Sequence, residues 1–148
     1  MTSITEPLRE QHKHCDDLFA AAEEAAQSAH WVECKAQFAE FRSELEAHFS
    51  GEETVLFPAF EQASGMSGGP TQVMRMEHTQ MRGLVEQMAG AVDTHDAAEF
   101  CGAGETLLML MQQHNMKEEN ILYPMCDQTL AVASGDVEER LKAVIEKK

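Results

Sequence analysis

The chain has 148 residues and a mass of 16.5 kDa, the size of one domain with a core of its own, so we expect a single domain over residues 1–148. Its 11 Lys and Arg against 26 Asp and Glu give a formal net charge of −15, so we expect no nucleic acid and no anionic membrane surface among its partners. With 43% hydrophobic residues, a mean hydropathy of −0.36 and no apolar run of about 18 residues, the sequence predicts a globular protein without a membrane span.

The N-terminus and the cysteines favour a cytoplasmic protein. The first residues do not join a basic segment to an apolar one, as a secretory signal would. The four cysteines lie far apart and include no Cys-x-x-Cys pair, so we expect reduced thiols rather than a disulfide framework or a cysteine-based zinc site. Ten Met and seven His, beside one Tyr and one Trp, are the unusual part of the composition.

Apolar residues recur at spacings of three and four along almost the whole chain, which predicts helices and no strands. Gly and Pro interrupt this pattern in few places, so the helices are long. Four long helices are expected, over residues 5–28, 31–63, 70–92 and about 96–130. Their short connections favour an all-α fold, an antiparallel up-down-up-down four-helix bundle.

Several helix ends carry capping signals. Thr5 is a candidate N-cap of the first helix, and either Thr94 or Asp96 caps the fourth. Residues 133–135 break the chain, and Asp136 then caps a short C-terminal fifth helix, which we expect on the outside of the bundle.

The chain contains an internal repeat with a period of 66 residues. Three pairs of residues mark it: His12 with His78, His48 with His114, and Pro58 with Pro124. The sequence HFSGEETVLFP at 48–58 lies over HNMKEENILYP at 114–124, so each half is one helical hairpin. Both prolines remove a backbone donor within a long helix, and a kink or a loosened turn is expected there.

Polar residues interrupt the apolar, core-facing stripes of the four helices. In the second helix this stripe ends in Val55 and Ala59, and in the fourth helix in Ile121 and Met125. A polar residue in such a stripe breaks the pattern of a core, and a break repeated at one place marks a site. The six polar members are His12, His48, Glu52, His78, His114 and Glu118.

The six polar residues are expected at one level of the bundle. The midpoint between His12 and His48 is residue 30, in the first connection, and that between His78 and His114 is residue 96, in the third. The midpoint between Glu52 and His78 is residue 65, in the second connection. A His and a Glu four residues apart project from one face of a helix, about 40° apart, so the second and fourth helices each offer a two-residue claw.

Two carboxylates in an apolar interior need compensating positive charge, which metal ions supply. Four neutral imidazoles and two carboxylates suit iron or manganese, and two ions can share the carboxylates as bridges. This arrangement leaves about two positions of each octahedron for an oxo or hydroxo group and a small exogenous ligand.

For several neighbouring residues the sequence leaves two interpretations open. Glu53 and Glu119 repeat as well, but at five residues from a His they point about 140° away from it, so they are solvated or support the ligands from outside. Asp16 is a seventh ligand, or part of an ion pair or a solvated face, and its repeat mate is Arg82. Cys15 lines the core or has a redox role. His30 and His95 are expected on the surface.

The repeated motif resembles the hemerythrin-like domains, also called HHE cation-binding domains. The similarity covers about residues 5–130, and its most specific parts are the two His-x-x-x-Glu-Glu stretches that end in Leu, an aromatic residue and Pro. The resemblance implies a four-helix bundle around two non-haem iron ions, bridged by an oxo or hydroxo group and by the Glu residues, with manganese or zinc as alternative metals. The ligands that it implies are His12, His48, Glu52, His78, His114 and Glu118.

The ligand set departs from that of the oxygen-carrying hemerythrins. Those proteins carry a second His one turn from the third-helix His, where this chain has Met74 and Arg82, and their last carboxylate is an Asp five residues after its His. The set is more similar to that of di-iron iron-sulfur cluster repair proteins and bacterial HHE domains of stress response. The resemblance implies a protein that binds O2, NO or peroxide or handles iron, for sensing, storage or stress protection. A di-iron peroxidase or oxidase, and a structural bundle that binds zinc, are the alternatives.

Overall fold

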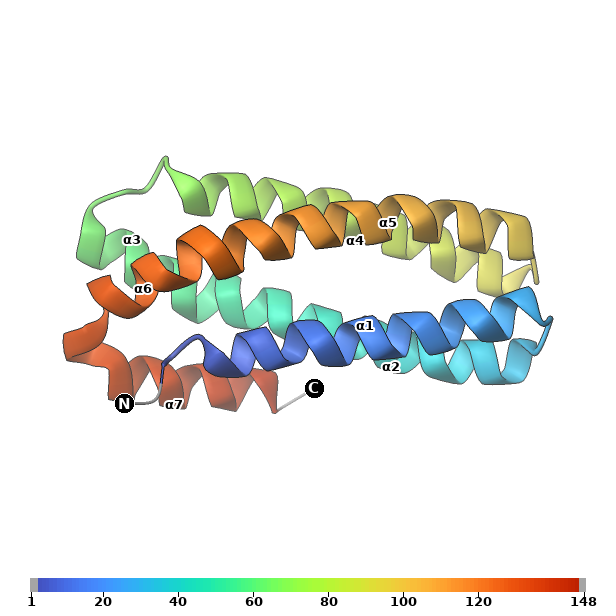
Figure 1. The fold of residues 1–148 in the computed structure, drawn as a ribbon, viewed down its shortest axis with the longest axis horizontal. Helices are drawn as coiled ribbons and strands as arrows, with labels where there is room; N and C mark the ends of the chain where they lie inside the picture. The colour runs from blue at the N-terminus through green and yellow to red at the C-terminus, as the bar shows by residue number, and fades with distance from the viewer. Residues whose placement is uncertain (1–2, 147–148) are drawn as a thin grey trace.

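The computed structural model describes residues 3–146, which form helices and no β-strand in that range. The four long helices are α1 (Glu6–Gln27), α2 (Trp31–Gly51), α4 (Pro70–Asp93) and α5 (Ala97–Lys117). Figure 1 shows them side by side along the long axis of the molecule, with the α1–α2 and α4–α5 connections at the same end. Within the described range, no helix is both long and apolar enough to cross a membrane.

Helices α2 and α5 each continue through a wider π-helical turn into a short α-helix. The π turns are η1 (Glu52–Leu56) and η2 (Glu118–Leu122), and the helices that follow are α3 (Phe57–Ser64) and α6 (Tyr123–Thr129). The two prolines stand in the first two positions of α3 and α6. The loosening expected at the prolines therefore takes the form of a π turn that ends just before each of them.

The π turns change which residues face the core beyond them. A π turn spans five residues between bonded groups instead of four, so the residues after it are displaced from the α-helical register. The predicted core position Ile121 is wrong for this reason, since it is 56% exposed. Ala59 and Met125 are partly buried and pack against the core from its edge. The residues buried after the π turns are instead Phe57, Phe60, Leu122, Tyr123 and Cys126.

Two apolar clusters fill the bundle, one on each side of the six polar residues. Phe19, Phe41 and Leu107 belong to the cluster nearer the α1–α2 and α4–α5 connections. Leu8 and Phe60 belong to the other, which the C-terminal helix completes. The polar layer thus lies between two apolar regions that shield it from water along the bundle axis.

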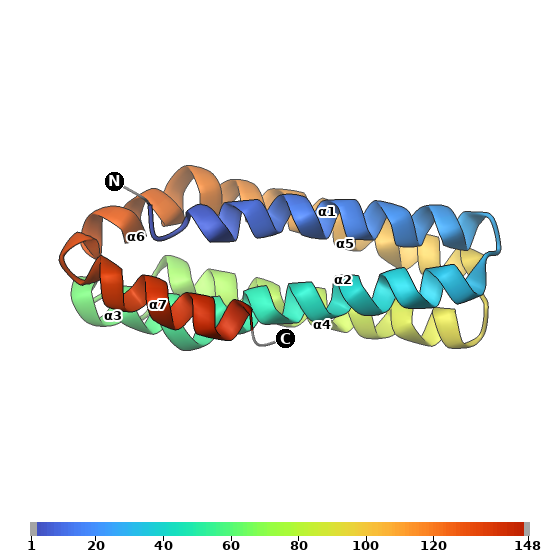
Figure 2. The same cartoon turned by 90° about the horizontal axis from the view of Figure 1, so that it is seen from below.

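The chain continues in a 3₁₀ turn, η3 (Ala131–Ala133), and in helix α7 (Ser134–Ile145), which lies along α2 and η1 on the outside of the bundle (Figure 2). The predicted start of this helix is wrong. Asp136 lies in its first turn and not at its N-cap, because the backbone is already helical at residue 134. Val137 and Leu141 are buried, as the apolar pattern indicates.

Gly51 lies where α7 packs against α2. A Cβ atom at this position would lie 3.5 Å from side-chain carbons of Ile145 and Leu141, which is ordinary van der Waals contact. A longer side chain would meet these two residues, so the small size of Gly51 lets the two helices approach closely.

Of two predicted N-caps, Asp96 caps its helix with its side chain and Thr5 does not. Asp96 caps α5, since its carboxylate accepts a hydrogen bond from a backbone N–H of the first turn at 3.0 Å. Thr5 precedes α1 as expected, but its hydroxyl donates to Asp127 Oδ2 at 2.8 Å and does not cap the helix. The Ser3 hydroxyl donates to the same oxygen at 2.6 Å, and the Ile4 N–H donates to Asp127 Oδ1 at 3.0 Å. Asp127 of α6 thereby ties down the start of α1.

Candidate metal centre

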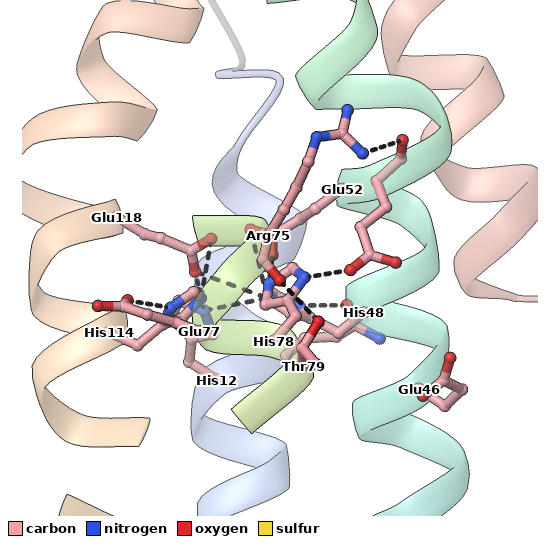
Figure 3. Close-up of polar contacts among 12 residues, drawn as sticks. His12, Glu46, His48, Glu52, Arg75, Glu77, His78, Thr79, His114 and Glu118 are labelled. Carbon is pink, nitrogen blue, oxygen red and sulfur yellow. Dashed lines mark hydrogen bonds and ion pairs between the residues drawn. The ribbon is translucent and has the colours of Figure 1, made fainter. Parts of the chain in front are cut away.

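Six side chains of the four long helices and the π turns meet in the middle of the bundle. Figure 3 shows the imidazole rings pointing toward one another and toward the carboxylates. Each residue is at most 5% exposed. The structure thus brings together every predicted ligand: His12, His48, Glu52, His78, His114 and Glu118.

The carboxylates that follow Glu52 and Glu118 contact the histidines from outside the layer. Nδ1 of His78 donates to Glu53 Oε2 at 2.7 Å, and Nδ1 of His12 donates to Glu119 Oε2 at 2.6 Å. Both glutamates lie in π turns, so the direction expected for an α-helix does not apply to them. Of the two interpretations left open, support from outside the layer is the one that the geometry favours.

The other two histidines are bound in the same way by residues that sequence reasoning missed. Nδ1 of His48 donates to Gln11 Oε1 at 2.9 Å, and Nδ1 of His114 donates to Glu77 Oε1 at 2.8 Å. Gln11 and Glu77 are 66 residues apart, and each stands directly before a histidine of the layer. The repeat therefore contained the signal that identifies them.

These bonds decide which ring nitrogen faces the centre. With the proton on Nδ1, the Nε2 lone pair of each ring is free to bind an ion, and the outer acceptor fixes the ring orientation. Nε2 of His12 and Nε2 of His48 lie only 3.1 Å apart, which favours a cation between the two lone pairs.

Four inward atoms have no hydrogen-bond partner among the described residues: Glu52 Oε1, His78 Nε2, His114 Nε2 and Glu118 Oε2. Buried polar atoms rarely lack a partner, and a metal ion would satisfy all four.

The donor atoms form two neighbouring sets, within each of which all atoms lie within 4.8 Å of one another. The first set consists of Glu52, His78, His114 and Glu118. The second set consists of His12, His48 and Glu118. The two sets share Glu118, and their imidazole and carboxylate donors are of the kind that bind iron and manganese.

The glutamates and histidines of the layer shift one another's pKa values. Burial by itself lowers the pKa of His48, but Glu52 and Glu118 raise it to about 10. Burial also lowers the pKa of His114, which Glu118 above all raises to about 9. Burial raises the pKa of Glu118, and hydrogen bonds with Glu52 and His114 outweigh it, so this pKa lies well below its ordinary value. Glu118 is therefore ionised in the layer, and either protons on the histidines or metal ions must neutralise its charge.

Tyr123 is a residue of this layer that sequence reasoning did not place there. It is fully buried, and its hydroxyl lies 2.7 Å from Glu52 Oε2 and 3.0 Å from Glu118 Oε1. Its position after the π turn, rather than the α-helical register, turns it toward the centre. The signal in the sequence is that the only tyrosine occupies the aromatic position of the second motif, where the first motif has Phe57.

The remaining candidates lie outside the layer. Asp16 is exposed and belongs to neither donor set, so the geometry does not favour a seventh ligand there. Cys15 is buried within the first apolar cluster. Arg82 pairs with Glu46 and Glu53 at 2.9 Å each. The other histidines are exposed: His14, His30 and His95.

The family model described as the hemerythrin HHE cation-binding domain matches residues 3–126, a range that includes all six side chains. The chain belongs to the hemerythrin HHE cation-binding family. Among curated proteins, the iron-sulfur cluster repair protein YtfE of Edwardsiella ictaluri (strain 93-146) is 35% identical over 99 residues, which is 60% of this chain and 44% of that protein. The chain thus spans less than half the length of this hemerythrin-like relative. No solved structure matches the chain.

Proposed function

We propose that this HHE domain is a non-haem di-iron protein that binds O2, NO or peroxide, or handles iron, for sensing, storage or stress protection. The observation that carries the proposal is the pair of donor sets that share Glu118, with four buried atoms that have no hydrogen-bond partner among the described residues. The proposed ligands are the six residues His12, His48, Glu52, His78, His114 and Glu118.

In this proposal each donor set would hold one ion, and Glu118, which belongs to both sets, would contribute to each. The outer acceptors hold every imidazole with Nε2 inward, so that little reorganisation is needed for binding. Phe49 stacks on His78 with ring centroids 4.0 Å apart and helps to keep water from the layer. Bound iron would supply open coordination positions and a one-electron change between ferrous and ferric states.

Iron is favoured over zinc by the donors and by the relative. Seven donor positions, shared between two sets of imidazoles and carboxylates, exceed the four ligands of a closed structural zinc site. The curated relative is named for the repair of iron-sulfur clusters, which supports iron as the metal of this chain as well. An oxo- or hydroxo-bridged iron pair is part of the proposal.

The proposal also includes the arrangement of the chain and its location. We propose one domain over residues 1–148, with a repeat of 66 residues and the four long helices in antiparallel up-down-up-down order, as the positions of the connections in Figure 1 support. The cytoplasm is the proposed location, in keeping with four cysteines that form no disulfide.

Metal analysis and visible spectroscopy of the purified protein test the function. We expect about two iron ions per chain and absorption from an oxo-to-iron transition in air, and a new spectrum when NO is added to the reduced protein. A double variant, His48→Ala with His114→Ala, should lose most of the metal, whereas the matched control, His14→Ala with His95→Ala, should keep it. Zinc in place of iron, or unchanged metal content in the first double variant, would contradict the proposal.

A further inference from the structure

The two donor sets differ in the aromatic residue that lies beside them. The ring of His12 stacks on that of Tyr123, with centroids 5.8 Å apart and planes at 20°. The ring of His78 stacks on that of Phe57 with almost the same geometry, 5.8 Å and 23°. The repeat therefore puts a phenol beside the second set at the place where a plain phenyl ring stands beside the first.

The phenol oxygen of Tyr123 lies close to every donor of the second set. It is 3.3 Å from His12 Nε2, 3.5 Å from His48 Nε2 and 3.0 Å from Glu118 Oε1. The side chain is fully buried, and its oxygen faces these three atoms and Glu52 Oε2, to which the hydroxyl donates at 2.7 Å.

The number of donors in each set also favours Tyr123 as a member of the second set. The first set has four residues, whereas the second has three, and Glu118 counts in both. An oxygen from Tyr123 brings the second set to four, so each ion has four protein residues around it. The phenyl ring of Phe57 offers the first set no such atom, and that set already holds a second carboxylate, Glu52.

We propose that Tyr123 is a direct metal ligand, whose phenolate oxygen binds the ion held by His12, His48 and Glu118. This inference rests on the proposed function, because it requires a metal ion in the second set. On binding, the O–H bond of Tyr123 breaks, a bond forms between its oxygen and the ion, and the proton leaves to water; no electron is transferred. A ferric ion favours such an anionic oxygen donor, and a bound cation is what makes the loss of the proton favourable.

The consequence is a centre whose two ions differ. An ion in the first set would have two imidazoles and two carboxylates around it. The ion in the second set has two imidazoles, one shared carboxylate and a phenolate. Tyrosine is an established protein ligand of iron elsewhere, and it gives ferric iron an intense colour through charge transfer from the phenolate.

The substitution Tyr123→Phe tests the inference, and the ring that it introduces already fits at the equivalent position of the repeat. Visible and resonance Raman spectra are compared for the iron-loaded protein and the variant. We expect a phenolate-to-iron band and the ring vibrations of a bound tyrosine in the parent protein, and neither in the variant. Because the chain has one tyrosine, the Raman spectrum of the parent protein decides the question even if the variant does not fold.

A second measurement avoids iron and its oxidation state. Zinc is titrated into the metal-stripped proteins in weak buffer, and the released protons are counted. The parent protein should release about one proton more per chain than Tyr123→Phe, because only the parent has a phenol to deprotonate.

The double variant Phe57→Tyr with Tyr123→Phe is the matched control, since it moves the phenol to the first set. We expect it to regain the charge-transfer band, at a different wavelength because the neighbouring ligands differ. If the parent protein binds iron without a phenolate band, and releases as many protons as Tyr123→Phe, the inference is overturned and the proposed function stands. If the parent protein binds no metal, both are overturned.

Discussion

The carboxylate of Glu53 is held between two partners, one on the metal layer and one outside it. Nδ1 of His78 donates to its Oε2 at 2.7 Å, and Nη1 of Arg82 donates to the same oxygen at 2.9 Å. Burial raises the pKa of Glu53, but His78 and Arg82 outweigh this and lower it to about 2. Glu53 therefore stays ionised and fixes both the orientation and the protonated nitrogen of the His78 ring.

Removal of this carboxylate should weaken metal binding although Glu53 is not a proposed ligand. We expect Glu53→Ala to lower the affinity of the first donor set by about 10- to 100-fold, because the His78 ring loses its orienting acceptor. Competition with a chelator of known affinity measures the change. The control is Glu46→Ala, which removes the other carboxylate partner of Arg82 without touching a histidine. Equal affinities for the two variants would contradict the role given to Glu53.

Removal of the metal should destabilise the fold. Without ions, buried atoms of Glu52, His78, His114 and Glu118 have no hydrogen-bond partner among the described residues. Since ligands that bind the folded state add their binding free energy to its stability, we expect a large drop in Tm on chelation. Thermal unfolding followed by circular dichroism, before and after a chelator and again after iron is restored, measures it. A Tm that does not respond to chelation would contradict a metal in this layer.

The pH dependence of the stripped protein should run opposite to that of metal binding. Against the cost of burial, the neighbouring glutamates raise the pKa of His48 to about 10 and that of His114 to about 9. A pKa raised by folding stabilises the fold fully below the unfolded value of 6.5, and this stabilisation is lost as the pH rises through 9 to 10. Metal binding needs neutral imidazoles and improves over the same range. The difference in Tm between loaded and stripped protein should therefore widen from about pH 7 to 9; a narrowing difference would contradict this.

The packing of α7 against α2 predicts opposite effects for two substitutions of Gly51. Gly51→Ala should stabilise the protein by about 0.5–1 kcal/mol, since a Cβ atom fits there and alanine favours the helix. Gly51→Lys, which copies the repeat mate of this position, should destabilise it by about 1–3 kcal/mol, because the longer side chain meets Leu141 and Ile145. Urea denaturation measures both. Gly83→Ala is the control, because no atom lies within 4 Å of a Cβ at Gly83. If Gly51→Lys is as stable as Gly51→Ala, the close packing of α7 at Gly51 is contradicted.

The contact between Asp127 and the start of α1 predicts a local effect on stability. Asp127→Ala removes the acceptor of bonds from Ser3, Ile4 and Thr5, and should cost about 1–3 kcal/mol. Amide hydrogen exchange should accelerate in the first turn of α1 more than in α4. The control is Asp136→Ala, which loses an exposed pair with Arg140 at 3.6 Å. If amide exchange in the first turn of α1 is equally fast in the two variants, the stabilising role given to Asp127 is contradicted.

The repeat predicted the polar layer correctly because the two periodicities in the sequence agree up to that layer. Helical spacing put His12, His48, His78 and His114 on apolar faces, and the midpoints between them put them at one height. All four rings are buried together in the structure. The same spacing failed at Ile121, beyond the layer, since it assumes 3.6 residues in every turn and the π turn breaks that assumption.

The sequence by itself determined the helical class, the family motif and the six inward residues, because these depend on local spacing within each helix. The tertiary structure alone decided the acceptor of each histidine, the place of Tyr123 and the role of Gly51. Each of these is a relation between two segments far apart in the chain: Glu53 with α4, Tyr123 with α1 and α2, and Gly51 with α7. Helical periodicity describes the direction of a side chain from its own axis, and only the packing of the helices specifies what stands opposite.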